Sequence, residues 1–223
     1  MILSSRLTKL INAVGEGESV ADIGTDHGYL PWELMKKCSK VIATDISEQC
    51  LQKSISRSGF TESKEEPEHR IGDGLSPISY GEVDNVVIAG MGGLLIISIL
   101  DADLEKAKSF GKLILQPMNA SDTLRKWLVG NGFSIIGEDI CFDDSRYYEI
   151  IEVKQGKENK PLLLDGEMGA LITDAHSLKK DFIKHQINNL HEILNKIGNP
   201  VAGKALERVE AIKMKICEWE NLL

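Results

Sequence analysis

An incomplete glycine-rich turn holds the residues of this sequence with the clearest chemical meaning. Residues 20–31 read VADIGTDHGYLP, in which Asp22 lies in an apolar run and Gly24 opens a turn. A dinucleotide-binding turn has the pattern G-x-G-x-x-G, so that backbone amides can approach a pyrophosphate. Here the six residues from Gly24 are GTDHGY, and Asp26 would repel phosphate charges. The turn therefore predicts a cationic ligand, and S-adenosylmethionine, with its sulfonium and ammonium groups, fits that description.

Acidic residues and glycines recur after the later apolar runs, in an order that suits the same cofactor. Asp45 follows the second run and can accept hydrogen bonds from ribose hydroxyls, and Asp73 can accept one from the adenine amino group. Each residue alone has an ordinary alternative as a turn, cap or helix-entry residue, but their joint order favours a site. The predicted cofactor-binding residues are Asp22, Gly24, Asp26, Asp45, Ile46, Asp73, Gly74, Ala89, Gly90, Met91 and Gly92.

Short apolar runs alternate with helical stretches over the first two thirds of the chain. The predicted strands cover 19–24, 40–46, 69–74, 83–90 and 112–117, followed by a hairpin of 133–142 and 147–153. Helices are predicted at 4–14, at 29–37, from an N-cap at Ser47, and between the fourth and fifth strands, packing through Leu94, Leu95, Ile97 and Leu100. This order predicts a doubly wound α/β domain, with a mostly parallel sheet that ends in an antiparallel hairpin. The predicted acids then share the carboxyl edge of the sheet, where such folds bind ligands.

The C-terminal part of the chain is helical in pattern from about residue 167. Apolar residues advance by three and four to Ile197, and the same spacing resumes after the break GNP at 198–200. Gly198 suits a position just past a helix end, and Pro200 suits the first turn of the next helix. We therefore expect a catalytic domain at 1–158 and an antiparallel coiled-coil hairpin at 159–223. Such a hairpin either stabilises or dimerises the protein, or holds a large substrate.

The composition indicates a globular protein of the cytoplasm. The 223 residues carry a net charge of −8, and residues 159–223 balance nine Lys and Arg against nine Asp and Glu, so the acidic excess lies in 1–158. No apolar run approaches the roughly 18 residues of a membrane span, and the N-terminus has no pattern of an export signal. The cysteines Cys38, Cys50, Cys141 and Cys217 are scattered, which predicts reduced thiols and no metal site.

Three sequence blocks together resemble a known enzyme family. DIGTDHGYLP, the later IAGMGG, and LILQP followed by LRKWL are similar to the bacterial tRNA (adenine-22, N1)-methyltransferases, the TrmK family, over nearly the whole chain. Members of that family have alanine at the place of Gly28, Gly-Glu at the place of Thr44 and Asp45, and asparagine at the place of Met118. The resemblance implies a class I methyltransferase-like fold and transfer of a methyl group from S-adenosylmethionine to N1 of an adenine in tRNA.

The sequence is consistent with methylation at N1 of adenine. The in-plane lone pair of N1 can attack directly, and the chain lacks both the Pro-Cys nucleophile used for pyrimidine C5 and the Asp/Asn-Pro-Pro-aromatic block used for exocyclic amines. The methylated base is cationic, so a carboxylate near it would stabilise the transition state. We predict Asp26 in that role, with His27 and Tyr29 orienting the base. Asp26 could instead only bind cofactor, and His27 could instead close the turn.

A paired adenine must leave its stack to expose N1, so the RNA must be held at several points. Basic candidates for phosphate contacts are Arg6, Lys9, Arg57, Arg125 and Lys126. Two alternatives to a tRNA methyltransferase remain at this level: a methyltransferase for a small molecule, which suits the acidic balance, and a non-catalytic binding module. The presence of Asp22, Asp45 and Asp73 counts against the last, and the sequence does not indicate an oligomeric state.

Overall fold

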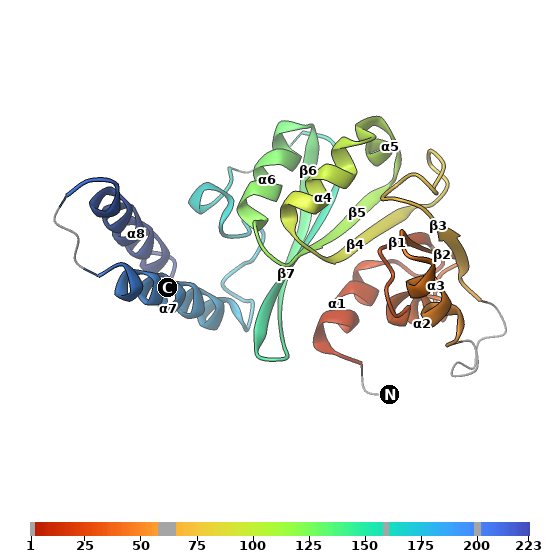
Figure 1. Ribbon diagram of the computed structural model, residues 1–223, viewed down its shortest axis with the longest axis horizontal. Coiled ribbons are helices and arrows are strands. Elements are labelled where there is room, and N and C mark those ends of the chain that lie inside the picture. The colour runs from red at the N-terminus through yellow and green to blue at the C-terminus, as the bar shows by residue number, and fades with distance from the viewer. Residues whose placement is uncertain (1–2, 58–65, 158–160, 199–201) are drawn as a thin grey trace. The chain divides into compact units, whose positions relative to one another are not determined.

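The predicted strands pair into a single sheet in the computed structural model, which describes residues 3–57, 66–157, 161–198 and 202–223. Within these residues the sheet has seven strands in the order β3-β2-β1-β4-β5-β7-β6 (Figure 1). The strands are β1 (Ser19–Ile23), β2 (Lys40–Asp45), β3 (Glu68–Ile71), β4 (Asn85–Met91), β5 (Lys112–Pro117), β6 (Phe133–Asp143) and β7 (Arg146–Gln155). The first five run parallel, and β7 pairs antiparallel with both β5 and β6. The predicted mostly parallel sheet with a terminal hairpin is therefore confirmed.

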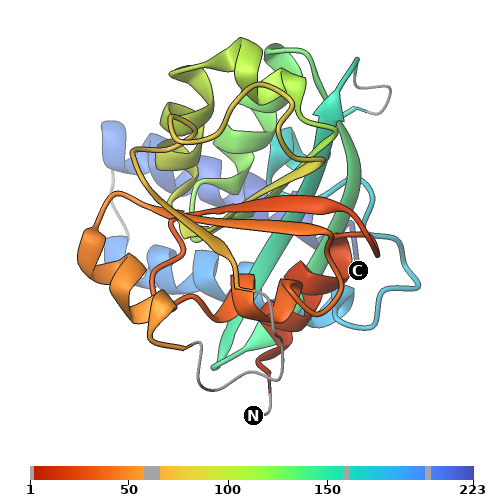
Figure 2. The same ribbon diagram turned by 90° about the vertical axis from the view of Figure 1, so that its right-hand side faces the viewer.

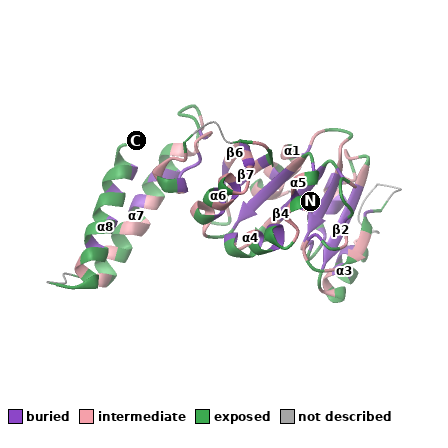
Figure 3. Ribbon diagram, turned by 90° about the horizontal axis from the view of Figure 1, so that it is seen from above, coloured by how far each residue is buried: buried purple, intermediate pink, exposed green. Residues whose placement is uncertain are grey.

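Helices cover both faces of this sheet, as Figures 1 and 2 show. One face carries α1 (Ser5–Ala13), α2 (Tyr29–Leu34) and α3 (Glu48–Ile55), and the other carries α4 (Gly93–Asp101), α5 (Leu104–Ser109) and α6 (Ser121–Gly130). The central strands β1, β2 and β5 are buried beyond their first residue, and β4 is buried over its first four residues, which explains their continuous apolar runs (Figure 3). The predicted N-cap of α3 is confirmed, because the Ser47 hydroxyl accepts a hydrogen bond from the amide of Cys50.

Two sequence-based details of the helices are wrong. Helix α2 ends at Leu34 instead of residue 37. In α4 the buried residues include Ile96, Ile99 and Leu100, whereas Leu94 and Leu95 are 63% and 53% exposed. The amide of Gly93 donates to the carbonyl oxygen of Asn119, and this contact sets how the first turn of α4 faces the sheet.

The C-terminal unit contains two helices that pack side by side, α7 (Lys179–Ile197) and α8 (Lys204–Glu220). Their seam includes an edge-on contact between Phe182 and Trp219, with ring centroids 6.0 Å apart. Gly198 ends α7 as predicted, while Pro200 lies outside the described residues. The helical pair is thus confirmed, and its coiled-coil geometry stays a prediction.

The helical region begins later in the structure than the sequence pattern predicts, and so does the second compact unit. Leu164 and Asp165 have positive φ angles, so the chain forms only the short 3₁₀ turn Leu164–Gly166 there, and α7 begins much later. The structure divides into compact units of Met1–Leu171 and Ile172–Leu223, not at 158/159. The boundary lies later because Met168 is fully buried and Leu171 packs against the core of the first unit.

Arg125 is buried in the first unit, so its side chain is not exposed to contact RNA. Its Nε donates to Glu138 Oε1 at 2.7 Å, its Nη2 to Glu149 Oε2 at 2.5 Å, and its Nη1 to the carbonyl oxygen of Gly166 at 2.9 Å. Burial acts to lower the pKa of Arg125, but the two carboxylates outweigh it and raise that pKa. The prediction of Arg125 as a phosphate contact is therefore wrong, and the residue instead ties α6 to the β6–β7 hairpin.

Candidate active site

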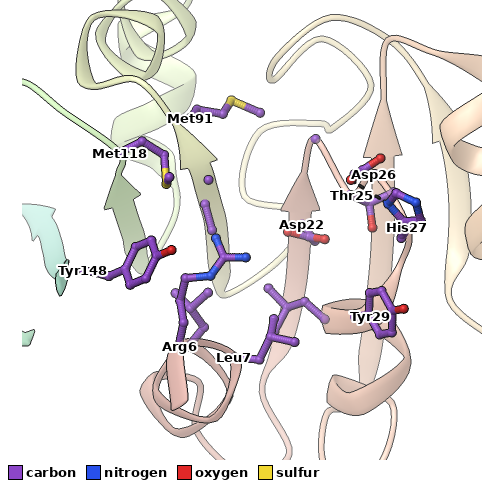
Figure 4. A pocket seen from close by; sticks show the side chains of 15 residues that line it. Arg6, Leu7, Asp22, Thr25, Asp26, His27, Tyr29, Met91, Met118 and Tyr148 are labelled. Carbon is purple, nitrogen blue, oxygen red and sulfur yellow. Dashed lines mark hydrogen bonds and ion pairs between the residues drawn. The ribbon is translucent and has the colours of Figure 1, made fainter. Parts of the chain in front are cut away.

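A cavity of about 500 Å³ opens at the carboxyl ends of β1 and β4 (Figure 4). This is the point where the strand order reverses, from β3-β2-β1 on one side to β4-β5 on the other. Open α/β sheets bind their ligands at such a point. The cavity is lined by Arg6, Leu7, Leu10, Asp22, Gly24, Thr25, Asp26, His27, Tyr29, Leu30, Ala89, Gly90, Met91, Met118 and Tyr148.

The turn after β1 is held in a conformation that exposes the Asp26 side chain. Gly24, Asp26 and Gly28 all have positive φ angles, of 76°, 46° and 72°. The amides of Gly24 and Thr25 both donate to the carbonyl oxygen of Thr44 at 2.9 Å, and the Asp26 amide donates to Asp45 Oδ2 at 3.1 Å. A side chain at Gly24 would meet the Met91 methyl group at 2.1 Å. The backbone at Gly24 therefore packs closely against Met91, and hydrogen bonds to β2 fix the position of the acidic turn.

The position of Gly28 predicts a measurable cost for an alanine there. A Cβ atom at Gly28 would lie 2.0 Å from the Ser54 hydroxyl oxygen and 2.8 Å from the Ser54 Cα. We expect Gly28→Ala to lower the free energy of unfolding by about 2–4 kcal/mol, the sum of left-handed strain and overpacking. Gly17→Ala is the matched control, because Gly17 has φ 77° with nothing within 4 Å, so it should show the strain alone. If urea unfolding shows the same loss of unfolding free energy for Gly28→Ala and Gly17→Ala, the contact with Ser54 adds no cost.

Asp22 lies at the floor of the cavity as a buried carboxyl group. Burial raises its pKa from 3.8 to about 7, and the nearby charge of Asp45 adds to the rise. The Thr25 hydroxyl lies close enough to oppose this rise, yet it is buried without a hydrogen bond of normal geometry to any described residue. No described Lys, Arg or His forms an ion pair with Asp22. A cationic ligand would therefore supply the missing partner of both the Asp22 carboxyl group and the Thr25 hydroxyl group.

The raised pKa of Asp22 predicts a pH-dependent loss of stability in the ligand-free protein. Between pH 4 and about 7 the folded protein keeps a proton that the unfolded chain has released, so stability falls as pH rises and levels off above the raised pKa. Asp22→Asn should be more stable than the wild type at pH 8, by up to about 4 kcal/mol, and equal to it at pH 4.

Urea unfolding of both proteins at pH 4 and pH 8 measures this difference. Asp84→Asn is the control of opposite sign, because side-chain and backbone hydrogen bonds from Ser19 hold the pKa of Asp84 below its usual range. Asp84→Asn should therefore lose stability at pH 8. An Asp22→Asn variant no more stable than wild type at pH 8 would show that the buried carboxyl is not the destabilising group.

Asp26 and His27 form a pair at the edge of the cavity. Asp26 Oδ2 lies 2.7 Å from His27 Nδ1, and Asp26 Oδ1 accepts a contact from the Cys50 thiol at 3.7 Å. Partial burial acts to raise the pKa of Asp26, but His27 outweighs it, helped by Cys50 and Lys53, so this pKa lies below its usual range. Asp26 is therefore ionised at neutral pH and offers a second carboxylate to the cavity.

A buried glutamine organises the opposite wall, which carries the residues that the sequence analysis did not place in the site. Gln116 Oε1 accepts hydrogen bonds from Arg6 Nη1 at 2.9 Å and from the Gly90 amide at 3.1 Å. The Arg6 guanidinium also lies 5.4 Å from the centroid of the Tyr148 ring. Gln116 belongs to the LILQP block, which is the sequence feature that points to this wall. No sequence feature points to Tyr148 or Met118 as residues of the cavity. The N-terminal helix and the terminal hairpin thus both contribute to the cavity.

The predicted site residues divide into two groups. The cavity brings together Asp22, Gly24, Asp26, His27, Tyr29, Ala89, Gly90 and Met91. The others lie outside its lining: Asp45, Ile46, Asp73, Gly74 and Gly92. Asp45 is joined to the cavity through the Asp26 amide and also accepts a hydrogen bond from the Ser47 amide at 2.8 Å. Gly74 has φ 50° and faces Ile99, so its conformation also serves packing.

Comparison with known proteins identifies the family. The methyltransferase domain family matches residues 3–151. The Bacillus subtilis tRNA (adenine(22)-N(1))-methyltransferase is 36% identical over 159 residues, which cover 69% of this chain and 66% of that enzyme. The crystal structure of the B. subtilis m1A22 tRNA methyltransferase TrmK superposes with a TM-score of 0.79 at 28% identity, covering 99% of this chain and 98% of that one. This chain belongs to the TrmK methyltransferase family.

The family relationship confirms the predicted fold class and cofactor type. TrmK of Mycoplasma capricolum, solved with the cofactor product S-adenosylhomocysteine, matches this chain with a TM-score of 0.82 at 26% identity, over 100% of this chain and 98% of that one. The unsatisfied Thr25 hydroxyl and the un-neutralised Asp22 carboxyl fit a sulfonium cofactor with an ammonium group. In the described part of the chain, no group of three or more His, Cys, Asp or Glu side chains could hold a metal ion. No described helix is long and apolar enough to cross a membrane.

Proposed function

We propose that this protein transfers a methyl group from S-adenosylmethionine to N1 of adenine 22 in tRNA. The observation that carries the proposal is the acidic cavity at the β1–β4 reversal, in a chain that belongs to the TrmK family. A carboxylate-lined cavity of this kind repels a dinucleotide and attracts a cationic cofactor. A tRNA substrate also agrees with the cytoplasmic location that the scattered cysteines indicate.

The residues on the two sides of the cavity have separable tasks in this reaction. Asp22 and Thr25 bind the polar end of the cofactor, and Asp45, with Ile46, Asp73 and Gly74 on the neighbouring strand ends, receives its ribose and adenine. Gly90 and Met91 leave the methyl group open to its acceptor. When bound, the cofactor supplies an electrophilic methyl group on a sulfonium sulfur. After the transfer, the rest of the cofactor departs as a neutral thioether.

Asp26, His27 and Tyr29 act on the adenine. The N1 lone pair forms the new N–C bond, and the ring gains the positive charge that the sulfonium loses. The ionised Asp26 carboxylate stabilises that charge as it develops, and His27, held at 2.7 Å, keeps the carboxylate in place. Tyr29 is 39% exposed at the cavity edge, so the exposed part of its ring is available to orient an extruded base.

Incubation of the purified protein with radiolabelled S-adenosylmethionine and bulk tRNA from cells that lack the modification tests the proposed function. Label recovered as N1-methyladenosine after nucleoside analysis is the expected result. Cofactor binding without labelled tRNA would instead favour the alternative, a methyltransferase for a small molecule, which the net charge of −8 would suit.

A further inference from the structure

Two arginines stand on opposite sides of the cavity, each against a tyrosine ring. The Arg6 guanidinium lies 5.4 Å from the centroid of Tyr148, and the Arg57 guanidinium lies 3.4 Å from the centroid of Tyr29. Figure 4 shows Arg6 beside Tyr148 on one side of Asp22, and Tyr29 on the other. Arg57 is fixed further by a hydrogen bond from its Nε to the His27 carbonyl oxygen at 2.5 Å. Each guanidinium is thus held by an aromatic ring and a neutral acceptor; Arg6 lines the cavity itself, and Arg57 lies behind Tyr29, which lines it.

Among the residues that the structure describes, these two cations have no carboxylate partner, unlike the other basic candidates of the first unit. Lys9 pairs with Asp139 at 2.6 Å, Lys126 pairs with Asp165, and Arg125 is buried between two glutamates. Among the described residues, Arg6 uses one guanidinium nitrogen for Gln116, and Arg57 uses one for the His27 carbonyl oxygen. The other N–H groups of both side chains are therefore available to an acceptor from outside the chain.

We propose that Arg6 and Arg57 bind phosphates of the RNA backbone on the two sides of the target nucleotide. This inference rests on the proposed function. Asp22 and Asp26 give the cavity a negative field that attracts the cofactor but repels RNA, so an extruded nucleotide needs cations where its backbone crosses the rim. The planar guanidinium matches phosphate oxygens in pairs, and the tyrosine behind each one reduces the freedom lost on binding. The two arginines are substrate-positioning residues and make no contact with the reacting atoms.

The variants Arg6→Gln and Arg57→Gln test the proposal through tRNA affinity and its salt dependence. Binding of unmodified tRNA is measured with S-adenosylhomocysteine present at several salt concentrations, and cofactor affinity is measured separately without RNA. Each variant should raise the Kd for tRNA about tenfold and reduce the slope of log Kd against log salt by roughly one phosphate contact. The Kd for S-adenosylmethionine and the thermal unfolding midpoint should stay unchanged.

Matched variants separate a phosphate contact from a general loss of charge. Lys9→Gln, one turn along α1 from Arg6, removes a cation already paired with Asp139 and should leave the tRNA Kd unchanged. Arg6→Lys and Arg57→Lys keep the charge but lose the paired donors, so they should retain the salt slope and bind tRNA more weakly than wild type.

The possible failures of the inference and of the proposed function are distinguishable. If wild type methylates tRNA while both Gln variants keep its Kd and salt slope, the inference is overturned and the function stands. If Arg6→Gln weakens S-adenosylmethionine binding without RNA, Arg6 binds the carboxylate of the cofactor, which overturns its assignment to phosphate. If wild type neither binds nor methylates tRNA, the proposed function fails first and the inference fails with it.

Discussion

Asp26→Asn should lower the rate of methyl transfer by about 100-fold or more while the protein stays folded. In the proposed reaction, the positive charge on the adenine ring develops beside the Asp26 carboxylate, which is ionised because its pKa lies below the usual range. Asparagine has the same shape but no charge, and it tolerates the left-handed backbone of φ 46° at this position. The loss should therefore appear in the chemical step and not in the yield of folded protein.

Single-turnover methylation at saturating cofactor and tRNA measures this effect, and calorimetry measures the cofactor Kd of the same variant. A slow chemical step with an unchanged Kd assigns Asp26 to catalysis, whereas a raised Kd with a normal step leaves it only as a cofactor ligand. Asp144→Asn is the matched control, because Asp144 is also an exposed aspartate with a positive φ, of 44°, outside the cavity lining. Unchanged turnover of Asp26→Asn would remove the role proposed for this carboxylate.

Arg125→Met should reduce the free energy of unfolding by about 3–5 kcal/mol, the largest stability effect expected in this chain. The substitution leaves Glu138 fully buried and Glu149 nearly so, with no cation between them. The same carboxylates also accept hydrogen bonds from the Leu171 amide and from the Ser121 hydroxyl, so the disturbance reaches both α6 and the end of the first unit.

Denaturant unfolding of Arg125→Met beside Lys126→Met tests this expectation. Lys126 is the next residue of α6 and pairs with a largely exposed carboxylate, so its loss should cost no more than about 1 kcal/mol. A loss below about 1 kcal/mol for Arg125→Met as well would show that the buried network is not structurally required.

The strands and the acidic turn could be predicted from the sequence because their signals are local. A strand buried on both faces is a continuous apolar run. Asp22 and Asp45 lie near the ends of the strands β1 and β2, and Asp26 follows β1 in the turn. The burial of Arg125 could not be read in this way, because its partners come from β6 and β7, and a charged side chain is usually exposed.

The second wall of the cavity was unpredictable for the same reason. Arg6 comes from α1, Gln116 from β5 and Tyr148 from β7, and only the folded sheet brings Arg6 against the other two. The exposed Leu94 and Leu95 were assigned to the core because apolar residues at four positions of a short helix fit more than one buried face. A tertiary contact at Gly93 decides between those faces.

Methylation of two tRNA transcripts that differ only at position 22 tests the proposed function most directly. The protein and S-adenosylmethionine are incubated with a transcript carrying adenine at that position or guanine in its place, and modified sites are mapped by arrest of reverse transcription. The expected result is an arrest at position 22 of the adenine transcript and no modification of the other. Equal methylation of both transcripts, or of neither while a small molecule is methylated, would contradict it.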